Sequence, residues 1–315
     1  MLLHGLNGGY VPAGPAAGVS RSSLPTGRNL HGLEADKLPT RDAYEKGVGA
    51  ASELIAKYAH DSGKPPEKVA MTLSALDVSR TSGQQVAQFM ALLGVEPVWN
   101  GEGRVIGLAV LPLDRLGRAR VDVTAQVSSI MRDAWPGLVK LLDQAVALVA
   151  EQDEPGHMNP VRKNMEETGD SRLFGVAPGT YGNSVGLALK ASAWRSEADL
   201  ARYYLDSNSY VYGREKHGEK DVESLVSNIR QTDLTYDIAV QGRTDTVSSS
   251  YAARMQGGFA VAARYVGGAR KIRQYVRESA PEGESVREFG DQMLRDINRT
   301  LLDESWREQM MVHGY

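Results

Sequence analysis

The sequence predicts an α/β protein, with a layered α/β unit followed by a mainly helical second half. Apolar residues recur with helix spacing in some stretches and strand spacing in others, and the two kinds of stretch alternate from residue 40 to residue 152. Beyond Gln152, a polar stretch rich in Gly and Pro precedes longer helical patterns. We expect either two domains, 1–152 and 153–315, or one continuous domain.

Composition narrows the class of protein. The chain has 315 residues, of which 42% are hydrophobic and 24% charged, as is ordinary for a globular protein with a sizeable core. The absence of Cys excludes disulfides, thiolate catalysis and Cys-ligated zinc or iron–sulfur clusters, and it favours a reducing cytoplasm. The net charge of −3 favours neither nucleic acid nor an anionic membrane as a partner. No apolar run approaches the roughly 20 residues of a membrane span.

The first half begins with a long loop and a clearly delimited helix. Residues 1–39 carry many Gly and Pro and show no periodicity, and loops of that length are usually functional or disordered. Thr40 is placed to cap a helix that ends at Gly63. Its apolar stripe has spacings of four and three, through Tyr44, Val48, Ala51, Ile55 and Tyr58. Both chain ends have the pattern of cuts through a larger chain.

Further elements follow in alternation. We expect a buried strand over 69–76, a helix from a Thr81–Gln84 capping box to Gly94, strands over 104–111 and 120–127, and a helix opened by Pro136. Strand 120–127 alternates apolar and polar residues, which predicts that only one of its faces is buried. In the second half, helices are expected over 198–205, roughly 251–279, and from 285 to the end.

Candidate functional residues occur first in the long loop. Residues 24–33 (LPTGRNLHGL) place Arg28, Asn29 and His31 within four residues, between two Pro-Thr steps. Arg28 suits a two-point contact with a substrate carboxylate, and His31 suits proton transfer or metal ligation near neutral pH. The alternative is structural: Arg28 and Asn29 bind carbonyls of their own loop, and His31 is a partly buried spacer.

Two further sets are rich in Arg or Gly. Arg118, Arg120 and Asp122 share one face of the predicted strand, which suits either a polyanionic ligand or a structural ladder of ion pairs. The same array includes Arg104, Arg115, Arg132 and Asp133. Arg172 and Tyr181 lie among glycines that allow the backbone to approach a flat ligand closely, and turn chemistry explains these glycines equally well.

Standard catalytic signatures are missing from the sequence. It has no Walker-A loop, dinucleotide fingerprint, HExxH motif or nucleophile elbow. The residues alone therefore indicate no more than a cytosolic α/β ligand-binding chain.

The order of several short blocks resembles the large subunit of tetrapyrrole metal chelatases, the family of the cobaltochelatase large subunit and the magnesium chelatase H subunit. The blocks are GYVPAGP at 9–15, LPTGRN at 24–29, LPT at 38–40, RTSGQ at 80–84, LGVEPVW at 93–99, LGRARVDVT at 116–124, RDAWP at 132–136, SRLFG at 171–175, PGTYG at 178–182 and HGY at 313–315. Together they extend over nearly the whole chain. Because the large subunit of this family is several times longer, the chain resembles a portion of its C-terminal half.

The blocks divide between the two branches of the family. LPTGRN, residues 122–124 and the turn at 134–136 are similar to the cobalt branch. His31 and two longer runs, at 153–163 and 181–194, are similar to the magnesium branch. Residues 245–251 also lack the acidic pattern associated with the cobalt branch, so the balance favours magnesium.

The resemblance implies an activity and a set of partners. The chain would be part of the tetrapyrrole-binding subunit of an enzyme that inserts Mg²⁺ or Co²⁺, as substrate metal, into a porphyrin or corrin-type ring. Because this chain has no nucleotide-binding loop, ATP would be hydrolysed by separate AAA+-type motor subunits. The alternative is a tetrapyrrole or metal carrier or sensor without insertion activity.

The resemblance also assigns roles to residues. The residues expected to contact the ring and its carboxylates are Arg28, Asn29, Arg118, Arg120, Arg132, Arg172 and Tyr181. Pyrrole N–H protons must leave before a metal binds the ring, so a base is needed near its centre. His31 is the candidate base or transient metal ligand, and Glu34 is the candidate assisting carboxylate, with Asp36 close to it.

Overall fold

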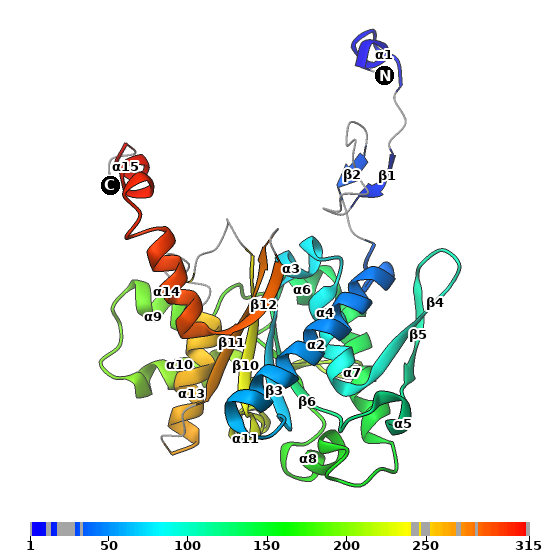
Figure 1. Ribbon diagram of the computed structural model, residues 1–315, viewed down its shortest axis with the longest axis vertical. Helices are drawn as coiled ribbons and strands as arrows, with labels where there is room; N and C mark the ends of the chain where they lie inside the picture. Colours follow the sequence, from blue (N-terminus) through cyan, green and yellow to red (C-terminus); the bar gives the residue numbers. More distant parts are fainter. Residues whose placement is uncertain are drawn as a thin grey trace.

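The computed structural model shows a three-layered body from which both terminal segments project (Figure 1). It describes residues 2–10, 14–17, 29–31, 34–240, 246, 253–268, 272–280 and 283–312. Among these residues, no helix combines the length and the hydropathy that a membrane span requires.

An eight-stranded mixed sheet forms the middle layer. Its strands lie in the order β12-β11-β10-β3-β6-β7-β8-β9. Their bounds are β3 Lys68–Leu73, β6 Asp122–Val127, β7 Leu173–Gly175, β8 Tyr210–Tyr212, β9 His217–Lys220, β10 Leu234–Val240, β11 Arg273–Ala280 and β12 Gly283–Glu288. The five central strands, from β11 to β7, are parallel, whereas β12, β8 and β9 pair antiparallel at the two edges.

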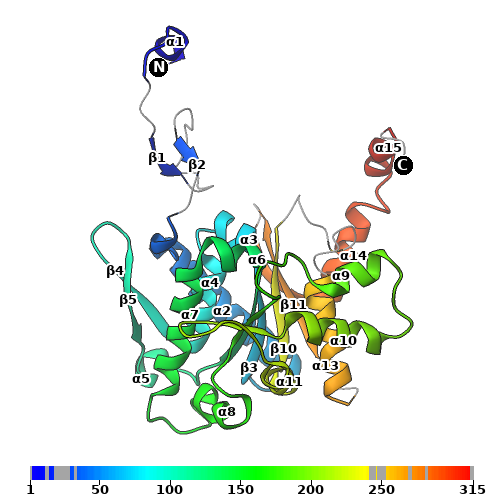
Figure 2. The same ribbon diagram turned by 180° about the vertical axis from the view of Figure 1, so that it is seen from behind.

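Helices cover both faces of the sheet (Figures 1 and 2). One face carries α2 (Arg41–Ser62), α4 (Gln84–Leu93) and α7 (Pro136–Ala150), which pack on one another. The other face carries α10 (Glu197–Asn208), α11 (Val222–Gln231) and α13 (Gly258–Val266). Each layer has its own apolar core, with Phe89 and Leu142 in the first and Tyr204 and Phe259 in the second.

Local sequence signals set the bounds of the helices on the first face. The Thr40 side chain accepts a hydrogen bond from the amide of Ala43 at 3.2 Å, and Gly63 ends α2 in the left-handed conformation (φ 78°). Gly94 ends α4 in the same way. The predicted helices at 40–63, 84–94 and 136–149 and the predicted buried strand near 69–76 are confirmed.

Shorter elements connect and flank the layers. They are α1 (Leu2–Leu6), β1 (Gly14–Ala17), β2 (Asn29–His31), the 3-10 turn η2 (Ala35–Lys37), α3 (Ala75–Arg80), β4 (Val95–Trp99), β5 (Val105–Val110), α5 (Leu113–Leu116), α6 (Ser129–Ala134), α8 (Pro160–Thr168), α9 (Ser184–Lys190), the π-helical turn η3 (Ala253–Gly257), α14 (Phe289–Arg299) and α15 (Glu304–Met311). The strand predicted over 104–111 is confirmed as β5, but it pairs with β4 in a separate two-stranded ribbon.

The prediction of a half-buried strand over 120–127 is wrong. All six residues of β6 are buried, including the polar Asp122, Thr124 and Gln126. β6 lies between β3 and β7, and helices cover both faces of the sheet, so its polar side chains have no solvent to face. They are buried in hydrogen-bonded networks instead.

The second half contains more of the sheet than the sequence predicts. Six of the eight strands lie beyond Gln152, so a mainly helical second half describes only part of it. The helix predicted over 251–279 is wrong after Val266, because Arg273–Ala280 forms β11. The helix predicted from Ser285 instead begins at Phe289, after β12. The division near residue 152 stays a prediction, and the sheet takes strands from both sides of it.

The direction of the chain through the sheet reverses once. From β3 the chain continues to β6 and β7 on one side, and later from β10 to β11 on the other side of β3. Loops that follow β3 and β10 therefore leave the carboxyl edge of the sheet in opposite directions. In open α/β sheets such a reversal creates the crevice where ligands bind.

A candidate ligand cleft at the carboxyl edge of the sheet

A cavity of about 460 Å³ lies at this reversal point. Most of its lining residues lie at the end of β6 or follow β3, β6 and β7, and Ile238 of β10, Asn208 of α10 and Met255 of η3 complete the described wall. Polar side chains in its wall include Ser74, Asp77, Arg80, Ser128, Tyr181 and Asn183. The volume is within the roughly 300–1,000 Å³ typical of small-molecule sites. We call this cavity the carboxyl-edge cleft.

Short helices after the strands fix the walls of the carboxyl-edge cleft. β3 ends at Leu73 and α3 begins at Ala75, while β6 ends at Val127 and Ser128 caps α6. The Ser128 hydroxyl accepts hydrogen bonds from the amides of Met131, at 3.3 Å, and Ala75, at 3.1 Å. One side chain thus joins the loops after two neighbouring strands.

Two buried carboxyl groups lie at this edge. Asp77, in the first turn of α3, is 8% exposed and Asp237, in β10, is 7% exposed. Burial raises the pKa of Asp77, against the opposing effects of the Ser74 hydroxyl and the Arg80 charge. Burial, reinforced by the charge of Asp77, raises the pKa of Asp237 well above its usual range, although the Ile238 amide donates to it at 2.8 Å. Among the described residues, neither carboxyl group forms an ion pair.

A clamp of three residues holds another wall of the cleft. The Arg132 guanidinium donates to the carbonyls of Val176 and Ala177 at 3.0 and 2.9 Å, and it forms two contacts with Asp133, at 2.6 and 2.8 Å. The Tyr181 hydroxyl donates to Asp133 at 2.8 Å. The hydrogen bond to Arg132 lowers the pKa of Asp133, and the bond to Asp133 raises the pKa of Tyr181. The clamp joins the loop after β7 to α6.

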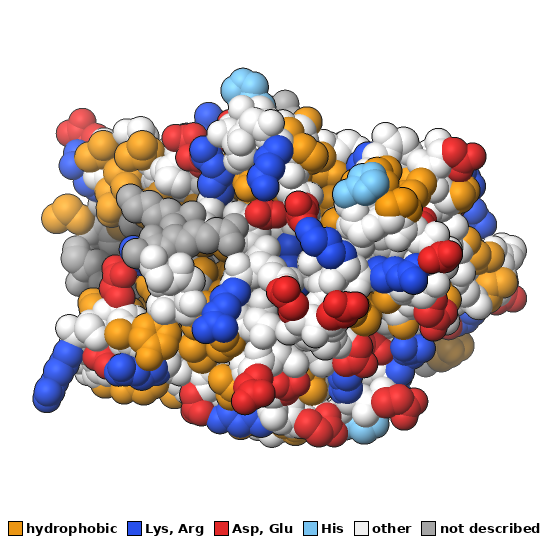
Figure 3. Space-filling view, turned by 90° about the horizontal axis from the view of Figure 1, so that it is seen from below, with side chains coloured by type: hydrophobic (Ala, Val, Ile, Leu, Met, Phe, Trp, Pro, Cys, Tyr) orange, Lys and Arg blue, Asp and Glu red, His pale blue; other side chains and the backbone are white. Residues whose placement is uncertain are grey.

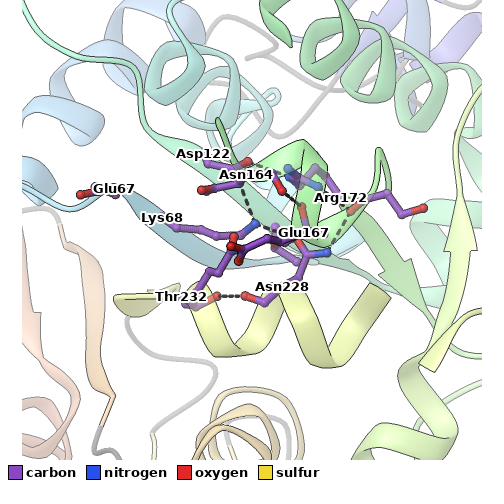
Figure 4. Close-up of polar contacts among 12 residues, drawn as sticks. Glu67, Lys68, Asp122, Asn164, Glu167, Arg172, Asn228 and Thr232 are labelled. Atoms are coloured by element: carbon purple, nitrogen blue, oxygen red, sulfur yellow. Dashed lines mark hydrogen bonds and ion pairs between the residues drawn. The ribbon is translucent and has the colours of Figure 1, made fainter. Parts of the chain in front are cut away.

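The opposite, amino edge of the sheet contains a buried ionic cluster (Figure 4). Asp122 accepts from Lys68 Nζ and from Arg172 Nε, both at 2.8 Å, and from the Asn164 amide at 3.0 Å. Lys68 and Asp122 are 0% exposed and Arg172 is 1% exposed. Asn228 accepts from Lys68 at 2.7 Å and from Thr124 at 2.9 Å. We call these residues the amino-edge cluster.

Mutual contacts determine the charge states in the amino-edge cluster. Burial alone would raise the pKa of Asp122, but the charges of Arg172 and Lys68 outweigh it and lower this pKa to about 2. Burial lowers the pKa of Lys68 to about 8, against the opposing effect of Asp122. On the surface at this end of the molecule, acidic and basic side chains are intermixed (Figure 3).

The structure separates the predicted ring-binding residues. Arg172 belongs to the amino-edge cluster, and Arg120 is also at that edge, 1% exposed and bound to Glu154 at 2.7 Å and to the Leu93 carbonyl at 3.0 Å. Arg118, partly buried, donates to the carbonyls of Leu92, Ala91 and Ala119. These guanidinium groups have protein partners, as in the structural alternative. By contrast, Tyr181 lines the carboxyl-edge cleft and Arg132 holds its wall.

The N-terminal candidates lie partly outside the described residues. The Arg28 residue and the side chains of Asn29 and His31 are not described, while the backbone of Asn29–His31 forms β2 and pairs in parallel with β1. Glu34 is half-buried, with its carboxylate 3.0 Å from Lys37 and 3.2 Å from Arg104. Arg104 also pairs with Asp36.

The segment that carries these candidates leaves the body beside the cleft. The Thr40 amide donates to the Ser82 carbonyl at 3.2 Å, just after α3, which lines the cleft. β1 and β2 accordingly project from the carboxyl edge (Figure 1). Among the described residues, no three His, Asp or Glu side chains are close enough to hold a metal ion.

Sequence reasoning missed Asp77 and Asp237. Each has a signal in the sequence, since Asp77 follows the buried strand β3 and Asp237 lies within an apolar strand, LTYDIAV. What the sequence does not show is that β3 and β10 are neighbours, although they lie in different halves of the chain.

The fold and the cleft define a doubly wound α/β protein with a candidate ligand site at the carboxyl edge of the central parallel strands. Over its whole length, residues 1–315, the chain matches the model of the CobN/Magnesium Chelatase family. The chain belongs to this family.

Individual relatives agree with this assignment. The chain is 36% identical to an uncharacterized protein of Methanocaldococcus jannaschii, and 32% identical both to the aerobic cobaltochelatase subunit CobN of Sinorhizobium sp and to the H subunit of the magnesium chelatase of Chlorobaculum parvum. These matches cover 98–100% of this chain and 26% of each relative. The structure of the catalytic subunit of cobaltochelatase from Mycobacterium tuberculosis superposes with a TM-score of 0.90 at 32% identity, over 100% of this chain and 28% of that one. The chain thus spans about a quarter of the length of the relatives it matches.

Proposed function

We propose that this chain is part of the large, tetrapyrrole-binding subunit of an ATP-dependent metal chelatase, which inserts a divalent metal into a porphyrin or corrin-type ring. The observation that carries the proposal is the family match over the whole chain, at 32% identity to subunits of both a cobaltochelatase and a magnesium chelatase. Mg²⁺ is favoured over Co²⁺ as substrate metal, on the blocks at 153–163 and 181–194.

The chemistry of insertion matches features of the carboxyl edge. The ring loses two pyrrole N–H protons, so the site needs a group that accepts protons. Its peripheral carboxylates need cations and hydrogen-bond donors. Arg80 and Tyr181 in the cleft are suitable donors, and the segment with Arg28, Asn29 and His31 leaves the body at the same edge. We therefore place the ring against the carboxyl-edge cleft, with His31 as proposed base or metal ligand and Glu34 as its assistant.

The other Arg residues predicted to contact the ring are bound to protein groups in the structure. Arg132 acts through the loop that it holds, because its guanidinium is bound to Asp133 and two carbonyls. Arg118, Arg120 and Arg172 would have to leave their present partners to reach a ring. The proposed function does not depend on these three.

The partners follow from the same assignment. Because the chain spans about a quarter of its relatives, insertion would require the rest of the large subunit, together with AAA+-type motor subunits that hydrolyse ATP. The cytoplasm is the proposed location.

A spectroscopic titration tests ring binding directly. The purified chain is titrated with a metal-free dicarboxylate porphyrin and with a metal-free corrin-type ring while the main absorption band of each is recorded. We expect a saturable shift with at least one ring, and about tenfold weaker binding in Tyr181→Ala and Arg28→Ala. The matched controls are Tyr265→Ala, on α13, and Arg115→Ala, in α5, which we expect to bind as the wild type does.

The outcomes of the titration and of an insertion assay distinguish a chelatase subunit from a carrier or sensor. No shift with either ring would overturn the proposal that this chain binds tetrapyrrole. Saturable binding without insertion, after the motor subunits and the rest of the large subunit are added, would favour a carrier or sensor.

A further inference from the structure

Two buried carboxyl groups, one in the wall of the carboxyl-edge cleft and one next to it, have no role in the proposed function. Asp77 and Asp237 come from the two strands, β3 and β10, at which the chain direction reverses. Asp77 lines the cleft, and Asp237 precedes Ile238, which also lines it. Both are more than nine-tenths buried, so neither is solvated as a surface carboxylate would be.

We propose that Asp77 is the proton-accepting catalytic residue of the carboxyl-edge cleft and that Asp237 is a positioning residue behind it. This inference rests on the proposed function: Asp77 takes the role of proton acceptor, and His31 keeps the other role proposed for it, that of transient metal ligand.

The surroundings of the pair set its titration. Among the described residues, the charge that acts on Asp77 is that of Arg80, on the same helix, and the charge of Asp77 in turn raises the pKa of Asp237 in β10. Among the described lining residues, Tyr181 is the remaining titratable group, and Tyr236 precedes Asp237 in β10. Two carboxyl groups that interact in a poorly solvated site titrate as a pair, in two steps, and hold one proton over a range of pH between the steps.

That shared proton gives the pair the properties of a base for this reaction. In the singly protonated state the pair has one free carboxylate, and its proton affinity is higher than that of an isolated aspartate. A general base is most effective when its pKa is near the working pH. An exposed aspartate, with an ordinary pKa near about 4, would be a much weaker base.

The proton balance of the step is simple. A carboxylate oxygen of Asp77 takes one pyrrole proton, the N–H bond breaks, and its electron pair stays on the ring nitrogen that binds the metal ion. The doubly protonated pair then releases a proton to water at the cleft. The same step removes the second pyrrole proton, so that each metal ion inserted releases two protons to solvent.

The decisive variants are Asp77→Asn and Asp237→Asn, with Asp114→Asn, an exposed residue of α5, as the matched control. In the complete chelatase we expect Asp77→Asn to slow insertion by about 10²–10⁴-fold with ring affinity changed less than threefold. We expect Asp237→Asn to move the acidic limb of the pH–rate profile to lower pH, since Asp77 then loses a neighbouring carboxyl group and keeps the Ser74 hydroxyl and the Arg80 charge, which both lower its pKa. Asp114→Asn should leave rate and profile unchanged.

A second readout does not need activity. The infrared carbonyl band of a protonated carboxyl group should be present in the wild-type chain at neutral pH, and it should disappear in Asp237→Asn. If this band is absent from the folded wild type, Asp77 and Asp237 do not share a proton at neutral pH, and the inference is overturned.

The outcomes separate this inference from the proposed function. If neither ring binds the chain, the proposed function fails, whatever the infrared band shows. If a ring binds and metal is inserted, but Asp77→Asn inserts it at the wild-type rate, the function stands and the inference is overturned. Melting curves of each variant establish that the folded protein is being compared.

Discussion

The two edges of the sheet differ in whether their buried carboxyl groups are paired with cations. At the amino edge, Asp122 accepts hydrogen bonds from two cations and an amide, and the cluster is closed to solvent. At the carboxyl edge, Asp77 and Asp237 are nearly as buried, yet neither forms an ion pair within the described residues. Charges that are fully paired contribute to the fold, whereas a buried group left without a counterion indicates a functional site. The buried carboxyl groups without a counterion therefore favour the carboxyl edge as the functional edge of the sheet.

The largest expected effect is at the amino edge, with Asp122→Asn. The substitution removes the negative charge that pairs with both Lys68 and Arg172, and it leaves these two buried cations without that partner. We expect the free energy of unfolding to fall by about 3–5 kcal/mol, measured by urea denaturation. A loss below about 1 kcal/mol would show that the cluster is not structural, and the comparison between the edges would fail.

Arg120→Met tests a second residue at the amino edge. It removes a two-point contact with Glu154 and donors to the carbonyls of Leu93 and Leu111. We expect a loss of about 2–3 kcal/mol in stability, because buried acceptors lose their donors. Ring affinity of the variant that remains folded should be unchanged, and a tenfold loss of affinity would restore Arg120 as a ring contact.

Asp237→Asn, at the carboxyl edge, should raise stability, whereas the two amino-edge substitutions lower it. Because the pKa of Asp237 is raised in the folded state, the folded protein binds more protons than the unfolded chain from about pH 4 up to the folded pKa. Wild-type stability therefore falls as the pH rises through that window, by about 1.4 kcal/mol for each unit of difference in pKa. The Asn side chain does not titrate, so the variant should gain stability over the wild type as the pH rises from about 4 toward the folded pKa of Asp237. The measurement is the free energy of unfolding of both proteins, from denaturation curves recorded across this pH range. If it changes with pH equally in the variant and in the wild type, the pKa of Asp237 is not raised.

Tyr181→Phe should have the smallest effect on the fold. The Tyr181 side chain is 67% exposed, so losing its hydrogen bond to Asp133 should change stability by less than about 0.5 kcal/mol. Affinity for the ring should still fall a few-fold, since the hydroxyl lies in the cleft wall. If titration shows equal affinity for the Tyr181→Phe variant and the wild-type chain, Tyr181 contributes only packing.

Local signals predict the parts of the fold that depend on local structure. Thr40, Gly63, Gly94 and Pro136 mark the ends of α2, α4 and α7 correctly, because caps act within one helical turn. The burial of β6 is not predictable in this way, since its second face is covered by α10 and α11, whose position no local pattern reveals. The hairpin β11–β12 has only short apolar runs, which do not distinguish a strand from a helix.

The candidate site is predictable only in part. The Gly-rich surroundings of Tyr181 single it out, and the structure places it in the cleft. The Arg residues near 118–120 and Arg172 are candidates because of their charge, which is the same whether an Arg contacts a ligand or a buried carboxylate. Asp77 and Asp237 become neighbours only through the order of strands in the sheet, and that order is not a property of either segment.

We infer that the carboxyl-edge cleft, and not the amino edge, receives the ring. Hydrogen exchange of the chain, measured with and without a saturating metal-free porphyrin, distinguishes the two edges. We predict slower exchange in residues 74–80, 128–133 and 176–183, and unchanged exchange in residues 64–68 and 160–172. Protection confined to the second group of residues, around the amino-edge cluster, would contradict the account.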